Sequence, residues 1–241
     1  ENKSMTYGGS APTYTYTTSG FVNNETSSVL GGTASYAIKT TGGDAVSNVS
    51  TAAVGSYKIH VSGLTSSNYN ISYATGTLTI NKAAVSMSLS PASGTLTYGT
   101  NGTSTITTNS DGELSCASSD DTVAECSITG TTLTITPKAN TTDGKAATIT
   151  VTQSAGTNYN ATTSTTQKTY SVTVNRKTLE CPSSPADKTY DGTEQPSGIT
   201  CPTGSTAGGD KKGTNASESY AQTCTANSGY KFATSCSVGY S

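Results

Sequence analysis

The sequence has few of the residues that fill a large protein core. Among its 241 residues there is no Trp, there are only two Phe, and hydrophobic residues make up 32%. One core spanning this length would be poorly filled, so several small cores are expected, each in a unit of about 100 residues. Disordered chains combine few aromatics with a high net charge. This chain has 14 Tyr and a net charge of −2, which favours a folded protein.

Basic residues and long apolar runs are also scarce. The 13 Lys and Arg are outnumbered by 15 Asp and Glu, and no basic stripe is present to contact a phosphate backbone, so we expect no nucleic-acid partner. No apolar run approaches the roughly 20 residues of a membrane-spanning helix. We therefore expect no membrane insertion in this segment, and Glu1 does not begin a signal peptide.

Catalytic signatures are absent from the sequence as well. The only histidine, His60, alternates away from Ile59 and Val61 in a strand-like pattern, which is typical of an exposed strand residue. A nucleophilic triad would need an activated Ser beside it, and no nucleophile elbow is present. We expect no enzymatic activity, no metal and no cofactor.

Two sequence markers recur at a spacing of about ninety residues. The first is a Tyr-Gly turn, in which Tyr98 follows Tyr7 by 91 residues and Tyr190 follows Tyr98 by 92. The second is an Asn-Tyr-Asn marker near the end of a repeat, centred on Tyr69 and again on Tyr159. Two independent markers at one spacing indicate tandem repeats. We place the boundaries after Lys82 and near Lys177, which gives domains 1–82, 83–177 and 178–241.

Within the repeats, apolar residues alternate with Thr or Ser at period two. This is the pattern of strands with one buried and one wet face, and Gly, Asn and Asp clusters separate the segments. The clearest alternating pairs are Met87 and Leu89, Leu133 and Ile135, Ile149 and Val151, and Val172 and Val174. Only Glu25 to Leu30 reads as a short helix, with Asn23 or Asn24 as its cap and Gly31-Gly32 as its end.

The two outer domains are each expected to lack a strand. Only six residues precede Tyr7, so the first strand of domain 1–82 is predicted to be missing, and domain 178–241 stops before a strand that should follow Val238. We expect the missing strands to come from more of the same polypeptide or from an adjacent subunit, because an open sheet edge invites strand addition.

The residues resemble those of known bacterial surface repeats. Domain 1–82, with Tyr7-Gly8, Gly20-Phe21-Val22-Asn23-Asn24-Glu25-Thr26 and Val54-Gly55-Ser56-Tyr57, resembles the MBG repeat of YGX type. Domain 83–177, with Ser118-Ser119-Asp120 and Ala147-Thr148-Ile149-Thr150-Val151, is similar to bacterial Ig-like repeats. Domain 178–241, with Lys188-Thr189-Tyr190-Asp191-Gly192-Thr193, is similar to YDG-type repeats of secreted adhesins. The resemblance implies a mainly β protein of small Ig-like or β-grasp-like domains in an extended array, and no catalysis.

Six cysteines predict a disulfide framework: Cys116, Cys126, Cys181, Cys201, Cys224 and Cys236. The metal alternative needs clustered Cys-x-x-Cys spacings, which the sequence lacks. Symmetry about turns favours the pairs Cys116–Cys126, Cys181–Cys201 and Cys224–Cys236, because residues equidistant from a turn lie opposite each other in a hairpin. The four cysteines of domain 178–241 allow three pairings, and the sequence leaves that choice open.

Two further groups of residues have a structural and a functional interpretation. Asp111 with Glu113, and Asp120 with Asp121, offer oxygens for calcium, but Asp in a turn usually bonds its own backbone. Tyr14 and Tyr16 alternate with Thr, which predicts both rings on one strand face. Such rings can bind a sugar or a protein, but in a chain with so few other aromatics they are expected to pack in the core.

These observations together favour a non-catalytic, extracellular structural segment of a bacterial surface adhesin or fibre that acts as a stalk or spacer. Its expected partners are neighbouring domains of a long chain or adjacent subunits of a fibre. Two other hypotheses remain open at this point. One repeat could itself bind a host glycan or protein, or the segment could be an accessory region of an extracellular enzyme.

Overall fold

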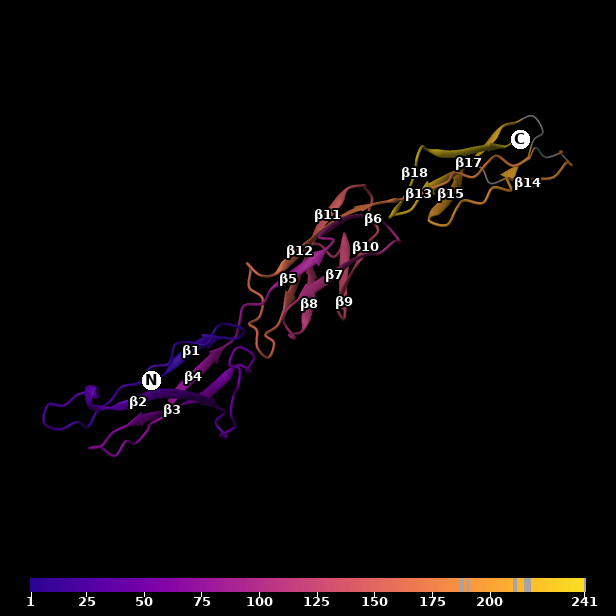
Figure 1. Ribbon diagram of the computed structural model, residues 1–241. Coiled ribbons are helices and arrows are strands. Elements are labelled where there is room, and N and C mark those ends of the chain that lie inside the picture. The colour runs from indigo at the N-terminus through magenta and orange to yellow at the C-terminus, as the bar shows by residue number, and fades with distance from the viewer. Residues whose placement is uncertain (187–188, 190, 210–211, 215–217, 241) are drawn as a thin grey trace. The chain divides into compact units, whose positions relative to one another are not determined.

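The computed structural model describes residues 1–186, 189, 191–209, 212–214 and 218–240. The protein is mainly β, as predicted (Figure 1). It divides into two compact units. Unit 1 comprises Glu1–Ser86 with the loop segments Thr108–Glu113 and Gln153–Thr166, and unit 2 comprises Met87–Thr107, Leu114–Thr152 and Gln167–Ser241. Lys188 and Tyr190, part of the third Tyr-Gly marker, lie outside the described residues.

Unit 1 is built on one mixed sheet. Its strand order is β1-β4-β3-β2, in which β1 runs parallel to β4 and the other pairs are antiparallel. Leu78 and Ile80 are buried on one face because side chains alternate along a strand. Met5, Ile38, Val49 and Ile59 complete this core. The strand bounds are β1 (Lys3–Thr6), β2 (Gly31–Lys39), β3 (Gly55–Thr65) and β4 (Gly76–Asn81).

Three predictions for unit 1 are corrected. The expected helix is a single 3-10 turn, Ser27–Val29, and its cap is Thr26, whose side-chain oxygen accepts from the Ser28 N–H. Asn23 and Asn24 instead adopt positive φ angles of 57° and 60° in the preceding turn. A strand does precede Tyr7, because β1 pairs with β4 through four residues. Residues 10–22, including Tyr14 and Tyr16, form no strand.

Unit 2 begins with a β-sandwich. One sheet has the order β5-β7-β10-β9 and the other β6-β12-β11-β8. Ile106, Leu133 and Ile135 of the first sheet share a core with Ile149, Val151, Val172 and Val174 of the second. The strand bounds are β5 (Met87–Ser90), β6 (Ser93–Thr97), β7 (Gly102–Thr108), β8 (Leu114–Ser118), β9 (Ala124–Thr129), β10 (Thr132–Pro137), β11 (Lys145–Gln153) and β12 (Lys168–Asn175).

The remainder of unit 2 has a thin core of Cys224, Cys236 and Val238, against which Ile199, Cys201 and Phe232 pack. Its sheets have the orders β15-β17-β19, β13-β18 and β14-β16. The strand bounds are β13 (Lys177–Leu179), β14 (Gln195–Pro196), β15 (Ser205–Gly209), β16 (Lys212–Gly213), β17 (Tyr220–Ala226), β18 (Tyr230–Phe232) and β19 (Cys236–Tyr240). Among the residues that the structure describes, the hydrophobic clusters fall within 5–80, 87–174 and 199–238.

All six cysteines form disulfides. Cys116 pairs with Cys126, but their strands, β8 and β9, belong to the two facing sheets of the sandwich and not to one hairpin. The bridge therefore joins the two layers at their edges.

The predicted pairings Cys181–Cys201 and Cys224–Cys236 are wrong. The structure pairs Cys181 with Cys236 and Cys201 with Cys224. Parallel pairing of β13 with β18 carries the chain after β13 alongside the chain after β18, and so brings Cys181 to Cys236. Cys224 and Cys236 do lie opposite each other on β17 and β19, as hairpin symmetry predicted, but each bridges a cysteine from an earlier segment.

Candidate functional site

Each Tyr-Gly tyrosine that the structure describes pairs with a tyrosine from a later connection between strands. In unit 2, the ring of Tyr98 lies edge-to-face on the ring of Tyr230, with centroids 5.3 Å apart and planes at 88°. Tyr98 begins the turn after β6, and its N–H donates to the Asn175 carbonyl at the end of β12. Tyr230 lies in the connection between β17 and β19. Edge-to-face geometry places the positive edge of one ring on the negative face of the other, which is favourable beyond the buried area.

Backbone hydrogen bonds hold the same place in unit 2. The Lys177 N–H donates to the Gly229 carbonyl, and the Gly229 N–H donates to the Asn140 carbonyl, both at 2.8 Å. Lys177 and Tyr230 are aligned in the parallel pairing of β13 with β18. Gly229 has a φ of +86°, and a Cβ there would lie 2.5 Å from the Tyr98 ring. Only glycine allows this backbone to approach the tyrosine so closely.

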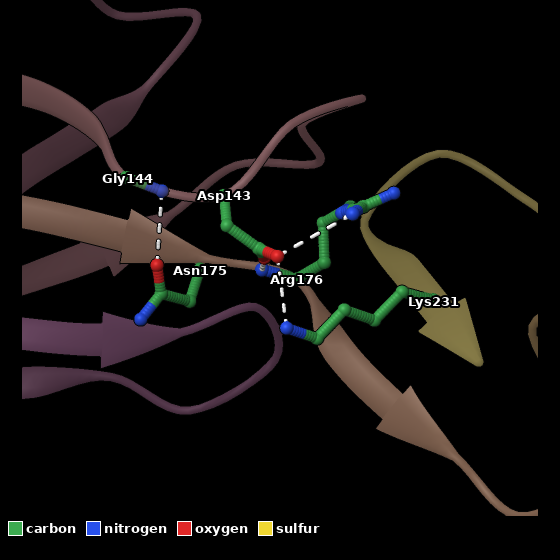
Figure 2. A network of polar contacts seen from close by, with 5 residues as sticks. All are labelled: Asp143, Gly144, Asn175, Arg176 and Lys231. Atoms are coloured by element: carbon green, nitrogen blue, oxygen red, sulfur yellow. Dashed lines mark hydrogen bonds and ion pairs between the residues drawn. The ribbon is translucent and has the colours of Figure 1, made fainter. Parts of the chain in front are cut away.

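A charged network completes this contact region, which we call the tyrosine joint of unit 2 (Figure 2). The Asp143 carboxylate receives Lys231 Nζ at 2.8 Å and an Arg176 guanidinium nitrogen at 3.3 Å. It also accepts the Arg176 backbone N–H at 2.8 Å. The adjacent Gly144 N–H donates to the Asn175 side-chain oxygen at 2.9 Å. One carboxylate thus ties the turn before β11 to the end of β12 and to β18.

The electrostatics of Asp143 follow from these contacts. Hydrogen bonds from Lys231 and from the backbone and side chain of Arg176 hold the pKa of the Asp143 carboxyl far below its usual range. The cause is that each donor favours the charged carboxylate over the neutral acid. The residue is therefore anionic at any physiological pH, and the network is intact there.

Unit 1 contains an equivalent tyrosine joint. Tyr7 lies edge-to-face on Tyr159, with centroids 5.6 Å apart and planes at 79°. The Tyr7 N–H donates to the Asn81 carbonyl at the end of β4, as Tyr98 does at the end of β12. Ala83 forms a parallel bridge with Tyr159, which matches the alignment of Lys177 with Tyr230. The two joints therefore share a ring pair and a parallel backbone bridge.

Side chains reinforce the joint of unit 1. The Asn158 side-chain oxygen accepts the Val54 N–H at 2.9 Å, and Lys82 Nζ donates to the Gly156 carbonyl at 2.7 Å. Asp111 accepts both the N–H and the hydroxyl of Thr157. These bonds fix the loop that presents Tyr159.

A groove of about 690 Å³ lies at one end of the unit 1 sheet. Five aromatic rings line it: Tyr16, Phe21, Tyr36, Tyr69 and Tyr73. Phe21 lies edge-to-face on Tyr69, with centroids 5.5 Å apart. The Tyr69 hydroxyl bonds the Glu25 carboxylate, and this bond raises the pKa of the tyrosine. Among the described residues, the large hydrophobic side chains with notable exposure all come from this part of the chain: Tyr16, Val22, Val29 and Tyr73.

The other residues singled out in the sequence have local roles. Tyr14 packs against the core beside Tyr36, whereas Tyr16 is 38% exposed and lines the groove. His60 lies half-buried on β3, on the face opposite Ile59. Asp120 accepts the N–H and hydroxyl of Thr122 in its own turn. Within the part of the chain that the structure describes, no three His, Cys, Asp or Glu side chains gather as a metal site.

A family model matches the N-terminal part of the chain. Residues 1–79 match the MBG domain (YGX type). The resemblance of this repeat to bacterial MBG repeats is thereby confirmed. No curated protein matches the sequence. None of the helices in the described residues has the length and apolar character needed to cross a membrane.

Several solved structures resemble the chain at low identity. Domains 4 and 5 of the S-layer protein SbsC align over 58% of this chain and 76% of theirs, with 14% identity and a TM-score of 0.33. Domains 1–6 of SbsC align over 79% of this chain and 29% of theirs, with 13% identity and a TM-score of 0.34. Eight Ig domains of Down Syndrome Cell Adhesion Molecule align over 99% and 39%, with 12% identity and a TM-score of 0.30. These scores are too low to establish a shared fold over the aligned lengths.

Sequence reasoning found the tyrosine markers but not their pairing. The markers indicate repetition, and Asp143-Gly144 is one of the Gly, Asn and Asp clusters that predict turns between strands. One available signal was that two of the Tyr-Gly turns, at Tyr7 and Tyr98, are followed in the next repeat by Asn158-Tyr159 and Gly229-Tyr230. A contact between the two markers would account for their recurrence together.

Proposed function

We propose that the chain is a non-catalytic, extracellular segment of a cell-surface protein. Its three β repeats, residues 1–82, 83–177 and 178–241, act in this proposal as a stalk or spacer. Three disulfides support an oxidising, extracellular location, because such bridges persist there and are rare in the cytosol. The MBG match supports a repeat of a surface protein. The partners proposed are neighbouring repeats of the same long chain.

The observation that carries this proposal is the repeated tyrosine joint. A spacer must resist bending where one repeat meets the next, and a short link alone leaves neighbouring domains free to move. The joint adds a ring pair and a parallel backbone bridge at the link, and unit 2 adds a carboxylate bound by two cations.

Residual dipolar couplings of the 15N-labelled chain test the proposal. If the joint of unit 2 is stiff, amides of the sandwich and amides of β15, β17 and β19 fit one alignment tensor. Replacing both joint tyrosines, Tyr98→Ala with Tyr230→Ala, is expected to require two alignment tensors, one for each group of amides. Tyr240→Ala, outside the joint, is the matched control and leaves one tensor. Two independent tensors in the unaltered chain would contradict a spacer role.

A further inference from the structure

A third tyrosine, Tyr69, lies at the same position in its loop as Tyr159 and Tyr230, the tyrosines that receive a Tyr-Gly turn in the two joints. Tyr159 and Tyr230 each lie in the connection between two antiparallel strands, β11 with β12 and β17 with β19. Tyr69 lies in the connection between β3 and β4, which are paired in the same way. It carries the same Asn-Tyr-Asn marker as Tyr159. The loop end of the first repeat therefore resembles the two loop ends that receive a Tyr-Gly turn, and here Phe21 of the same repeat already lies edge-to-face on Tyr69.

The aromatic groove lies at this loop end. Tyr69, Asn70 and Ile71 line it together with Phe21 and Tyr73. Tyr73 of this lining is 40% exposed, and Val22, which follows Phe21 in the chain, is 60% exposed.

We propose that this groove binds the Tyr-Gly turn of another repeat of the same kind. The tyrosine of that turn packs against the Phe21 and Tyr69 rings. The backbone that follows the last strand of the docked repeat pairs with Tyr69. The inference rests on the proposed function, because it extends the joint to one more link of the array.

The backbone of the first joint specifies the pairing that is expected. In unit 1 the Ala83 N–H donates to the Asn158 carbonyl, and the Asn160 N–H donates to the Ala83 carbonyl. The equivalent groups beside Tyr69 are the Asn68 carbonyl and the Asn70 N–H. Among the described residues, no backbone carbonyl accepts from the Asn70 N–H. That amide is therefore the site where a docked repeat would form a new hydrogen bond.

The charge of the groove also suits this occupant. Glu1 is the only charged residue among those that line it, and its carboxylate is bonded to Lys3 and Thr15. The known donor turns, Met5-Thr6-Tyr7-Gly8 and Leu96-Thr97-Tyr98-Gly99, carry no charged side chain. A groove whose one charged side chain is already bonded and an uncharged turn bury each other without leaving an unpaired charge.

The direct test joins an additional copy of residues 83–177 ahead of Glu1 in the full chain. Because Glu1 and Asn2 line the groove, the added repeat reaches its rim. Segmental labelling confines the 15N signals to residues 1–241, and the readout is hydrogen exchange of the Asn70 amide. We expect exchange to slow by about tenfold or more. The Asn160 amide, already bonded to Ala83, serves as the internal reference.

Variants of the added copy decide between outcomes. Tyr98→Ala in that copy alone is expected to restore fast exchange at Asn70, whereas Thr95→Ala, at an exposed position of β6, is expected to retain slow exchange. Unchanged exchange at Asn70 beside a folded added copy would overturn the proposal. So would slow exchange that persists with Tyr98→Ala.

A second measurement does not depend on folding of the added repeat. A cyclic peptide containing Leu96-Thr97-Tyr98-Gly99-Thr100 is titrated into the unaltered chain and is expected to shift the Phe21 and Tyr69 ring signals. The same peptide with Tyr98→Ala is expected to leave them in place. If the peptide causes no shift, the groove does not bind a Tyr-Gly turn. Saturable binding of an oligosaccharide that Tyr69→Ala abolishes would likewise contradict the proposal. Neither result would affect the dipolar-coupling test of the proposed function, which concerns Tyr98 and Tyr230 in unit 2.

Discussion

Asp143 and Lys231, 88 residues apart in the sequence, lie with carboxylate oxygen and ammonium nitrogen 2.8 Å from each other. Arg176 binds the same carboxylate. This ion pair therefore links the turn before β11, which carries Asp143, to β18, which carries Lys231 (Figure 2).

Asp143→Asn is expected to lower the denaturant midpoint of unit 2 by a modest amount, and the loss should shrink as salt is added because the carboxylate is solvent-exposed. The lowered pKa of Asp143 gives the sign of the pH effect. The carboxylate stabilises the fold above the ordinary Asp pKa, and this contribution is lost as the pH falls through the depressed value. The difference between the two proteins should thus be constant near pH 7 and disappear in strong acid. Asp121→Asn, at an exposed residue outside the network, is the control. An equal loss in that variant would contradict the assignment.

Gly229→Ala is expected to destabilise unit 2. The new Cβ would meet the Tyr98 ring at 2.5 Å, on a backbone with a φ of +86°. Gly130→Ala is a matched control, because that glycine also has a positive φ, +59°, but nothing within 4 Å of its Cβ position. We expect Gly229→Ala to lower the free energy of unfolding by about 1–3 kcal/mol more than the control, the usual cost of overpacking. Equal losses in urea titrations would show that the ring contact has no effect.

Peptide mapping without reduction is expected to recover Cys181 linked to Cys236 and Cys201 linked to Cys224. These bridges close 55 and 23 residues, against 10 for Cys116–Cys126. The loop-entropy relation gives about 4 kcal/mol for the longest loop and about 3 kcal/mol for the shortest. Replacing Cys181 and Cys236 by Ser should therefore destabilise its region more than replacing Cys116 and Cys126 destabilises the sandwich. Recovery of Cys224 linked to Cys236 would contradict the structure.

Asn158→Ala is expected to weaken the joint of unit 1, because the Val54 N–H loses its acceptor at 2.9 Å. The loss of one such bond is about 1 kcal/mol. Asn160→Ala provides the control, since its side chain only approaches the Lys82 carbonyl at 3.5 Å. Faster hydrogen exchange at Val54 in the first variant, but not in the second, is the result we expect. If the Val54 amide exchanges at the same rate in both variants, the loop that presents Tyr159 is stabilised by other bonds.

The sequence predicted the strands well where one face of a sheet is buried. Leu133, Ile135, Val172 and Val174 alternate with Thr or Ser because a strand directs successive side chains to opposite faces. Residues 10–22 also alternate around Tyr14 and Tyr16, yet they pair with no strand. Alternation specifies side-chain direction and does not supply the partner that a strand needs.

Contacts between segments that lie far apart in the sequence could not be predicted from it. Hairpin symmetry correctly placed Cys224 opposite Cys236, but the bridge of each depends on where β13 and the segment before Cys201 run. Tyr7 and Tyr159 are 152 residues apart, and no local pattern shows that they meet. The spacing of markers along the chain predicts repeats, whereas only the structure shows that a Tyr-Gly tyrosine touches a tyrosine of a later loop.

A double-mutant cycle on Tyr98 and Tyr230 tests the tyrosine joint most directly. The free energy of unfolding of unit 2 is measured for the unaltered chain, for Tyr98→Ala, for Tyr230→Ala and for the double variant. Edge-to-face pairing predicts that the two losses are not additive and differ from the double loss by about 0.5–1.5 kcal/mol. Additive losses would mean that the two rings stabilise their own segments separately, and that Tyr98 and Tyr230 do not form a joint.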